Sequence, residues 1–383
     1  MRQEEAAMNN GIALICVEPY MDARGSAPLL EGEIEGALVV YHTLLAGDTF
    51  ELGMDQENLR TLVLVDGTVS VGEAESLTRL DARAVYVSDP EKSLKLSAEE
   101  KSHVLEVRRR LGARRKQWLK DNHTAFPMVQ MYDDCPQYRE DFKSRISISR
   151  SMIDHHALPD YCMGSNESYG PDRVEKHMHP LLDQFFFSFP DNDIDLMIDD
   201  KIQPYGPNTL IHIPLGSDHG VLIPEGKKMH YVWIDFMVSE GAVEYLDEVH
   251  KKTGVMEHFD ESGQIREQGR LAMSCYCRKR DVKEITAGHG HGSFPMLGEA
   301  NGCTNGCCAG ISYYSMEEYT PAAVHEDQEG FIVLAGAGWA KIGEEEFWVE
   351  PETAFVAPAG TPHQMRCASS QERLVVFWFH AQS

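Results

Sequence analysis

The sequence predicts an all-β chain of tandem barrels joined by linking helices. A pattern of an apolar strand, a turn glycine and a second strand recurs three times along the 383 residues, and such internal repetition is a strong guide to architecture. Apolar and polar residues alternate in residues 145–151 and 374–380, as they do in strands with one buried face. The 31 Gly and 18 Pro, together with 42% apolar residues, fit a turn-rich globular protein of two or three domains.

Residues 1–96 are predicted to form the first barrel. Within them, residues 44–89 contain an apolar strand that ends at the turn glycine Gly67, then a polar strand and a second apolar strand. This is the weakest of the three copies of the pattern, and only its order of strands and turns predicts a barrel.

A helix over residues 97–123 is predicted to link this barrel to the next. Ser97 and Glu100 form a capping box, and the apolar residues that follow recur at helical spacing. Arginines and a lysine are concentrated between residues 108 and 116 of an otherwise acidic chain, and for this basic face we favour a solvated surface or an inter-domain contact over an anion site. A second helix over residues 240–254 is predicted to close the middle barrel.

The middle segment, residues 124–255, carries the strongest chemical pattern. His177 and His179 are two residues apart, so they point to the same side of a strand. Asp183 follows within seven residues of His177, and His219 ends a Pro-x-Gly-x-x-His turn. Three imidazoles and one carboxylate from separate strands would make a site for Fe, Mn, Ni, Cu or Zn.

These residues resemble the motifs of the cupin superfamily. The first cupin motif contains H-x-H followed by a carboxylate, and the second contains the turn P-x-G-x-x-H that His219 ends here. Asp183 stands where the family usually has Glu. The resemblance implies double-stranded β-helix, or jelly-roll, barrels with His177, His179, Asp183 and His219 as metal ligands. Asp183 and His219 are also the predicted catalytic residues, Asp183 as a proton acceptor if it leaves the metal.

The resemblance recurs in residues 256–383, which are predicted to form a C-terminal cupin barrel with a partial metal motif. His325 and Glu329 match the later part of the first motif, and His363 matches the end of the second. Ala323 occupies the place of the first histidine. This copy therefore offers two imidazoles and one carboxylate, a set that holds a metal with open positions or is a decayed site.

The first barrel lacks such ligands. By the same resemblance Arg60 occupies the carboxylate place, and no histidine occurs between His42 and His103. We therefore expect residues 1–96 to form a degenerate cupin-like barrel without metal.

Resemblance to metal-bearing cupins implies dioxygenation, decarboxylation, bond lysis or isomerisation. We interpret the chain as a metal-dependent enzyme that acts on a small, oxygen-rich organic molecule in the middle barrel. A dioxygenase with Fe or Mn is favoured, and Ni, Cu and Zn stay open. The alternatives are a non-redox lyase, decarboxylase or isomerase, and a small-ligand sensor without turnover.

Charge and composition exclude some classes of binding partner. A net charge of −26, from 35 basic and 61 acidic residues, opposes binding to nucleic acid or to an anionic membrane. No apolar run approaches the roughly 18 residues of a membrane span, and the first residues lack the basic region of a secretory signal. We expect a cytoplasmic protein with a small-molecule substrate, and a homodimer stays open.

Cysteine usage offers one further alternative. Five of the nine cysteines lie in residues 275–308, which also contain His289 and His291. Cys and His are zinc ligands, but the spacing lacks the paired C-x2-C of known zinc modules. We therefore favour a loop-rich segment with free thiols over a second type of metal site.

Overall fold

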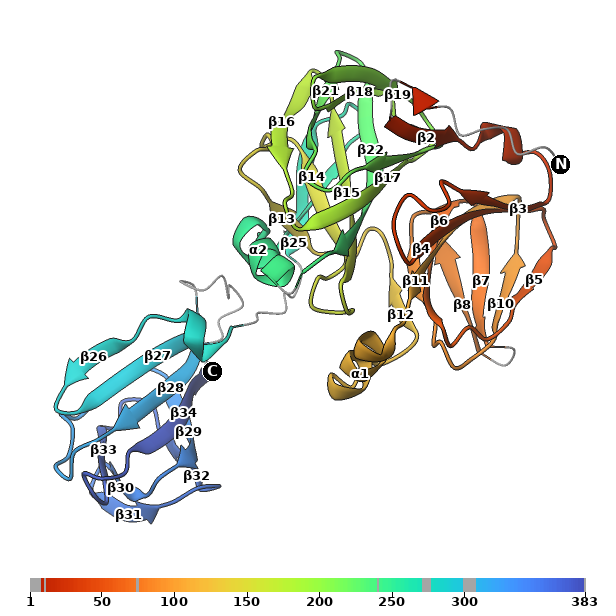
Figure 1. The fold of residues 1–383 in the computed structure, drawn as a ribbon. Coiled ribbons are helices and arrows are strands. Elements are labelled where there is room, and N and C mark those ends of the chain that lie inside the picture. Colours follow the sequence, from red (N-terminus) through yellow and green to blue (C-terminus); the bar gives the residue numbers. More distant parts are fainter. Residues whose placement is uncertain are drawn as a thin grey trace. The chain divides into compact units, whose positions relative to one another are not determined.

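Most of the regular structure is β-strand, which confirms the all-β prediction (Figure 1). The computed structural model describes residues 8–9, 12–73, 76–239, 241–270, 277–298 and 308–381. The chain divides into two compact units, Met1–Leu271 and Ala272–Ser383. No helix within the described ranges is long and apolar enough to cross a membrane.

The first barrel of the first unit consists of two sheets that enclose an apolar core. Its strands are β3 (Gly25–Leu29), β4 (Ala37–Leu44), β5 (Thr49–Leu52), β6 (Asn58–Asp66), β7 (Thr68–Glu73), β8 (Ser76–Asp81), β9 (Val85–Val87), β10 (Leu94–Ala98), β11 (Ser102–Arg110) and β12 (Met128–Gln130). The sheets have the orders β12-β9-β6-β11-β4-β3 and β5-β10-β7-β8. Leu62 and Val104 from the larger sheet pack with Val71 and Leu96 from the smaller one, so each strand contributes to a closed interior.

The middle barrel follows the same plan. Its strands are β1 (Met8–Asn9), β2 (Ile12–Cys16), β13 (Gln137–Arg139), β14 (Ile148–Ile153), β15 (Tyr161–Tyr169), β16 (Asp172–Met178), β17 (Leu182–Ser188), β18 (Ile194–Ile198), β19 (Lys201–Tyr205), β20 (Thr209–Ile213), β21 (Asp218–Ile223), β22 (Lys228–Met237) and β23 (Lys251–Lys252). The sheets have the orders β1-β2-β20-β17-β22-β15-β14-β13-β23 and β16-β21-β18-β19. Helix α2 (Gly241–Val249) follows β22 and buries Leu246 in the core of this barrel, which confirms the first part of the helix predicted over residues 240–254. The last part of that prediction is wrong, because β23 occupies residues 251–252.

The two barrels of the first unit exchange strands. β2 comes from the N-terminus but pairs with β20 of the middle barrel, with Leu14 opposite Ile211. In the other direction, β12 pairs with β9 of the first barrel, with Met128 opposite Val87. Strand pairing therefore crosses the predicted borders between these barrels.

The predicted helix over residues 97–123 is wrong in its first part. Most of residues 94–110 belong to β10 and β11, and helix α1 spans only Ala113–Asp121. The physical reason is that β11 is buried on both faces, with Val104 in the core of the first barrel and Leu105 in the core shared by the two barrels. A strand buried on both faces loses its polar alternation, so its apolar residues also fit a helical period.

The second unit contains one further barrel. A hairpin of β24 (Val255–Phe259) and β25 (Ile265–Arg270) precedes it at the end of the first unit. The strands of the second unit are β26 (Ile285–Gly288), β27 (His291–Leu297), β28 (Cys308–Tyr314), β29 (Gln328–Ala335), β30 (Gly338–Ile342), β31 (Glu345–Val349), β32 (Ala354–Ala357), β33 (His363–Cys367) and β34 (Leu374–Ala381). They form sheets of order β26-β27-β28-β34-β29-β32 and β31-β30-β33 around a core that includes Phe331, Met365 and Val376.

Candidate metal centres

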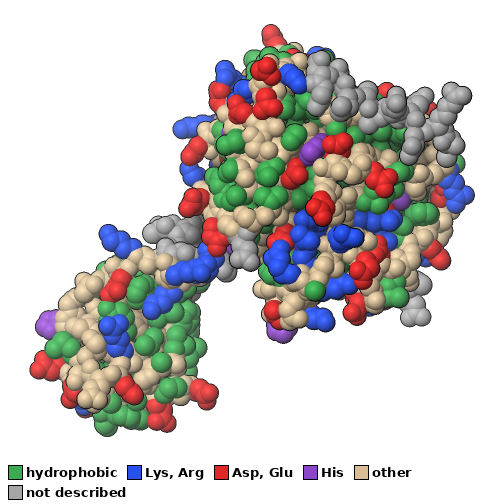
Figure 2. Space-filling model, viewed as in Figure 1, with side chains coloured by type: hydrophobic (Ala, Val, Ile, Leu, Met, Phe, Trp, Pro, Cys, Tyr) green, Lys and Arg blue, Asp and Glu red, His purple; other side chains and the backbone are tan. Residues whose placement is uncertain are grey.

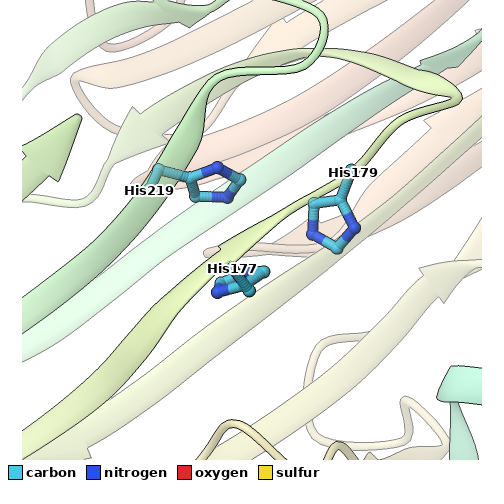
Figure 3. A group of neighbouring side chains, drawn as sticks. All are labelled: His177, His179 and His219. Atoms are coloured by element: carbon cyan, nitrogen blue, oxygen red, sulfur yellow. The ribbon is translucent and has the colours of Figure 1, made fainter. Parts of the chain in front are cut away.

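Three histidines meet in the middle barrel (Figure 3). His177 lies near the end of β16 and is paired in register with His219 on β21, and His179 follows directly after β16. One ligand nitrogen from each lies within 4.8 Å of the other two. The ring centroids are 4.5, 4.9 and 5.4 Å apart. The structure therefore brings together the three histidines that the sequence singled out.

Hydrogen bonds fix the orientation of these rings. Nδ1 of His177 and of His219 donates to a main-chain carbonyl oxygen two residues earlier in the chain, at 2.8 and 3.2 Å. Nδ1 of His179 bonds to the hydroxyl of Tyr245 on α2 at 3.0 Å. Because Nδ1 of His177 and of His219 donates, Nε2 of these two rings carries the free lone pair, as in metal-binding histidines with an outer hydrogen-bond partner.

Burial keeps the three imidazoles neutral. It lowers the pKa of His179 to about 3, with the nearby His177 adding to the effect. Burial also lowers the pKa of His177, and it lowers the pKa of His219 well below the ordinary value. Neutral imidazole is the form that binds metal, so these donors fit a divalent transition metal.

The same pocket holds acidic and basic groups next to the histidines. The Lys143 ammonium donates to Asn166 Oδ1 at 2.8 Å and forms an ion pair with Glu140. Burial alone would raise the pKa of Glu140, but Lys143 and His250 lower it below its usual range. Glu140 is therefore charged, so an anion and a cation stand beside the histidines.

A second buried carboxylate, Asp235 on β22, completes the wall of the pocket. It accepts a hydrogen bond from Gln184 at 2.7 Å, and burial raises the pKa of Asp235 to about 7. Sequence reasoning missed Glu140, Lys143 and Asp235, because none of them has a ligand spacing to the histidines. Only the fold shows that they share a pocket.

Asp183 requires a correction, because the structure places it away from the three histidines. Asp183 lies on β17, where its Oδ1 accepts a hydrogen bond from His212 Nε2 at 2.8 Å. The next residue, Gln184, lies on the other face of β17 and donates to Asp235, which lines the pocket of the three histidines. Side chains alternate along a strand, so one residue of difference in spacing decides which face a side chain takes.

We expect Asp183→Asn to leave the metal content of the purified protein unchanged. The side chain bonds to His212 rather than to the histidine group, so removing its charge does not remove a ligand. Elemental analysis beside the wild-type protein checks this. A loss of about one ion per chain would mean that Asp183 binds the metal after all.

A second group of ligands lies in the C-terminal barrel. Nε2 of His363, on β33, and of His325, before β29, lie 2.9 and 3.3 Å from Oε2 of Glu329. Ala323 stands opposite His363, as His177 stands opposite His219 in the middle barrel. The partial motif therefore forms a real cluster of two imidazoles and one carboxylate.

The donors of the C-terminal group also fit a metal ion. Glu329 Oε2 is buried and makes no hydrogen bond to any part of the chain that the structure describes. His380 on β34 adds a further imidazole, with Nε2 3.6 Å from Glu329 Oε1 and Nδ1 bonded to Asp327 at 2.9 Å. Sequence reasoning missed His380, although its strand is the neighbour of the strand that carries Glu329. A cation at this position would give the carboxylate oxygen a partner.

In the first barrel an ion-pair cluster occupies the interior. Arg60 Nε donates to Glu106 Oε1 at 2.6 Å, and His42 Nε2 bonds to the other oxygen of Glu106 at 2.8 Å. Burial alone would raise the pKa of Glu106, but His42 and Arg108 lower it to about 2. The residue that the resemblance put in the carboxylate place, Arg60, is thus a partner of a buried carboxylate.

Two further groups lie outside these centres. His155 and His156 both bond to Asp247 Oδ1, at 3.0 and 2.7 Å. Of the cysteines in residues 275–308, Cys275, Cys303 and Cys307 lie outside the described residues. Cys277 and Cys308 are half-buried.

Comparison with known families identifies the C-terminal barrel. Residues 313–380 match the family model of the cupin domain. The resemblance to cupins is therefore confirmed, and it rests on the segment that holds His325, Glu329 and His363. A search of curated proteins gave no match.

Solved structures with similar folds are distant from this chain. A cupin 2 conserved barrel domain protein from Leptotrichia buccalis has 10% identity and a TM-score of 0.41, covering 62% of this chain and 99% of its own. An IolB-like protein from Salmonella typhimurium has 16% identity and a TM-score of 0.47, covering 58% and 92%. A variant of Bacillus subtilis oxalate decarboxylase has 10% identity and a TM-score of 0.40, covering 59% and 72%.

Proposed function

We propose that the chain is a metal-dependent enzyme that acts on a small, oxygen-rich organic molecule in the middle barrel, most readily as a dioxygenase. The observation that carries the proposal is the convergence of His177, His179 and His219 in a buried pocket. Three protein donors leave coordination positions open for a substrate, which is the arrangement of catalytic rather than structural metal sites.

Iron or manganese is the proposed metal because a dioxygenase needs a redox-active ion. Imidazole nitrogens suit several first-row metals, so nickel, copper and zinc remain alternatives. When bound, such a metal would supply Lewis acidity and, in the case of iron, reactivity toward dioxygen. The two imidazoles and one carboxylate of the C-terminal group are also a ligand set of non-heme iron oxygenases, but they lie in the other compact unit.

The side chains around the histidines have roles of their own. Lys143 can donate to a negatively charged oxygen of the substrate, because its ammonium lies in the same pocket. Tyr245 holds the ring of His179 in place. The cavity among these side chains is small, with a volume of about 30 Å³, which limits the proposal to a very small substrate.

A second candidate is a non-redox lyase, decarboxylase or isomerase. The pair of Glu140 and Lys143 beside the histidines favours it, since a carboxylate and an ammonium in one pocket can move a proton between two substrate atoms. Asp235, whose pKa burial raises to about 7, is a further group that can exchange a proton near neutral pH.

The test combines metal replacement with two assays. Protein stripped by a chelator is reloaded with Fe(II), Mn(II), Ni(II), Cu(II) or Zn(II) and offered catechols, diketones and small carboxylic acids. A dioxygenase consumes oxygen when it is loaded with the correct metal, and the metal-free protein consumes no oxygen. Turnover that continues under anaerobic conditions would contradict the dioxygenase and support the non-redox enzyme. Ligand binding without turnover under both conditions would contradict both and identify a sensor.

A further inference from the structure

A second cavity of the first unit contains no residue of the metal pocket. It has a volume of about 510 Å³ and lies where the first barrel, α1 and the middle barrel meet. Arg109 and Arg110 from the end of β11 and Arg114 and Arg115 from α1 line it. Figure 2 shows basic side chains gathered around this part of the surface, in a protein with a net charge of −26.

Arg109 is a buried cation with incomplete partners. Arg109 is only 7% exposed, and its Nη1 donates to the main-chain oxygen of Glu35 at 2.8 Å. Its guanidinium stacks 5.1 Å above the ring of Phe236. Its Nε is buried without a hydrogen-bond partner among the described residues, and none of their carboxylates lies within 4.0 Å of the guanidinium. A buried charge in this state is costly unless a counterion is supplied.

The helix end beside it adds to the positive potential. Gly112 caps α1 without a side-chain hydrogen bond, and the first turn contains no acidic residue. Arg114 and Arg115 occupy that turn, where the helix dipole favours negative charge. Asp160 pairs with both of them, with Oδ2 3.0 Å from Arg115 Nε, so one carboxylate serves two guanidinium groups.

The remaining acidic groups of the cavity do not balance the arginines. Asp183 is bound to His212, and Arg110 forms no ion pair with any residue that the structure describes. The carboxylates of the lining are those of Glu35, Asp160 and Asp183, against four guanidinium groups. Desolvation by burial lowers the pKa of Arg109 to about 10, with Arg115 adding to it, as expected for a cation that lacks its counterion.

We propose that this cavity binds a small organic anion, a phosphate monoester or a dicarboxylate, whose charged oxygens contact Arg109, Arg110 and Arg115. Guanidinium groups recognise the oxygens of both chemistries with paired hydrogen bonds. Phe236, on which the Arg109 guanidinium stacks, and Met237 also line the cavity and add apolar surface to it. The volume lies within the range of roughly 300 to 1,000 Å³ for small-molecule sites, and it exceeds what inorganic phosphate alone would fill.

From the sequence we favoured a solvated surface or an inter-domain contact for this basic face, and the ion pairs of Arg114 and Arg115 with Asp160 of the middle barrel fit the contact. Arg108 of that face turns to the other side of β11, where it donates to Glu106 inside the first barrel. The alternation of the strand therefore places Arg108 on the face opposite to that of Arg109.

The test is calorimetric titration of the full chain with glycerol 3-phosphate, with succinate and with inorganic phosphate at constant ionic strength. Saturable binding of glycerol 3-phosphate or of succinate supports the site, and the tighter of the two identifies the chemistry. Arg115→Gln should weaken that binding at least about tenfold, because removing one charged hydrogen-bond partner costs 1.4 kcal/mol or more. Arg79→Gln, which makes the same charge change at an exposed position outside the cavity, should bind as the wild type does.

Two results would overturn the proposal. One is the absence of saturable binding by both organic anions. The other is an equal loss in Arg79→Gln and Arg115→Gln, since that reports general charge rather than a site. Arg110→Gln serves as a second cavity variant, because Arg110 is exposed and its substitution spares the buried contacts of Arg109.

Discussion

His219→Ala should remove about one metal ion per chain from the middle barrel. The variant leaves two imidazoles of the three that converge there, and no described carboxylate belongs to that ligand group. Among the residues that the structure describes, this group contains no further donor to replace the lost nitrogen. Metal content is measured by elemental analysis of protein purified in the presence of excess metal.

Thermal unfolding should change in parallel with the metal. A ligand at about 100 times its Kd stabilises the folded state by roughly 2.7 kcal/mol, so loss of the ion should lower the Tm of the holoprotein by several degrees. A chelator should lower the wild-type Tm and have little further effect on this site in His219→Ala. His258→Ala, in the β24–β25 hairpin, is the matched control. Full metal content in His219→Ala would show that these histidines are not its ligands.

The three histidines could be predicted from the sequence because strand geometry determines their relation. Two residues at i and i+2 share a face whatever the rest of the fold does. The turn before His219 then limits where the third imidazole lies. The pairing of His177 with His219 confirms this local argument.

Asp183 could not be placed by the same reasoning. The chain between His179 and β17 is a turn, and a turn that shifts the register by one residue exchanges the two faces of the next strand. Asp183 therefore faces His212, and Gln184 takes the inner position. Residue types do not reveal such a shift, because Asp183 and Gln184 are both polar.

Long-range pairing was also beyond the sequence pattern. The exchange of β2 and β12 between barrels joins residues far apart in the chain, such as Leu14 and Ile211. The burial of β11 between two cores follows from that association of barrels, and it removed the polar face that would have identified a strand. Glu140 and Lys143 reach the metal pocket for the same reason, through the fold rather than through spacing.

The two metal centres are expected to contribute unequally to turnover. The middle pocket buries its histidines beside Glu140 and Lys143, so metal binding and proton transfer can occur in one enclosed space. In the C-terminal barrel the side chain of His325 is 39% exposed, and Ala323 stands where a further ligand would lie. Each group offers three donors, so the number of ligands does not separate the two centres, and the charged pair beside the middle histidines decides between them. We therefore place the chemistry in the middle barrel.

His179→Ala should reduce turnover of the substrate found by screening by more than about 100-fold, since loss of an outer hydrogen-bond partner alone costs 10- to 100-fold. His363→Ala should retain most of the turnover while losing the metal of the C-terminal barrel, which elemental analysis of both variants records. Far-ultraviolet circular dichroism checks that each variant is folded. Turnover abolished only in His363→Ala would move the active site to His325, Glu329 and His363, and the middle histidines would then hold a structural ion. The two centres lie in separate compact units, so the variants report on them independently.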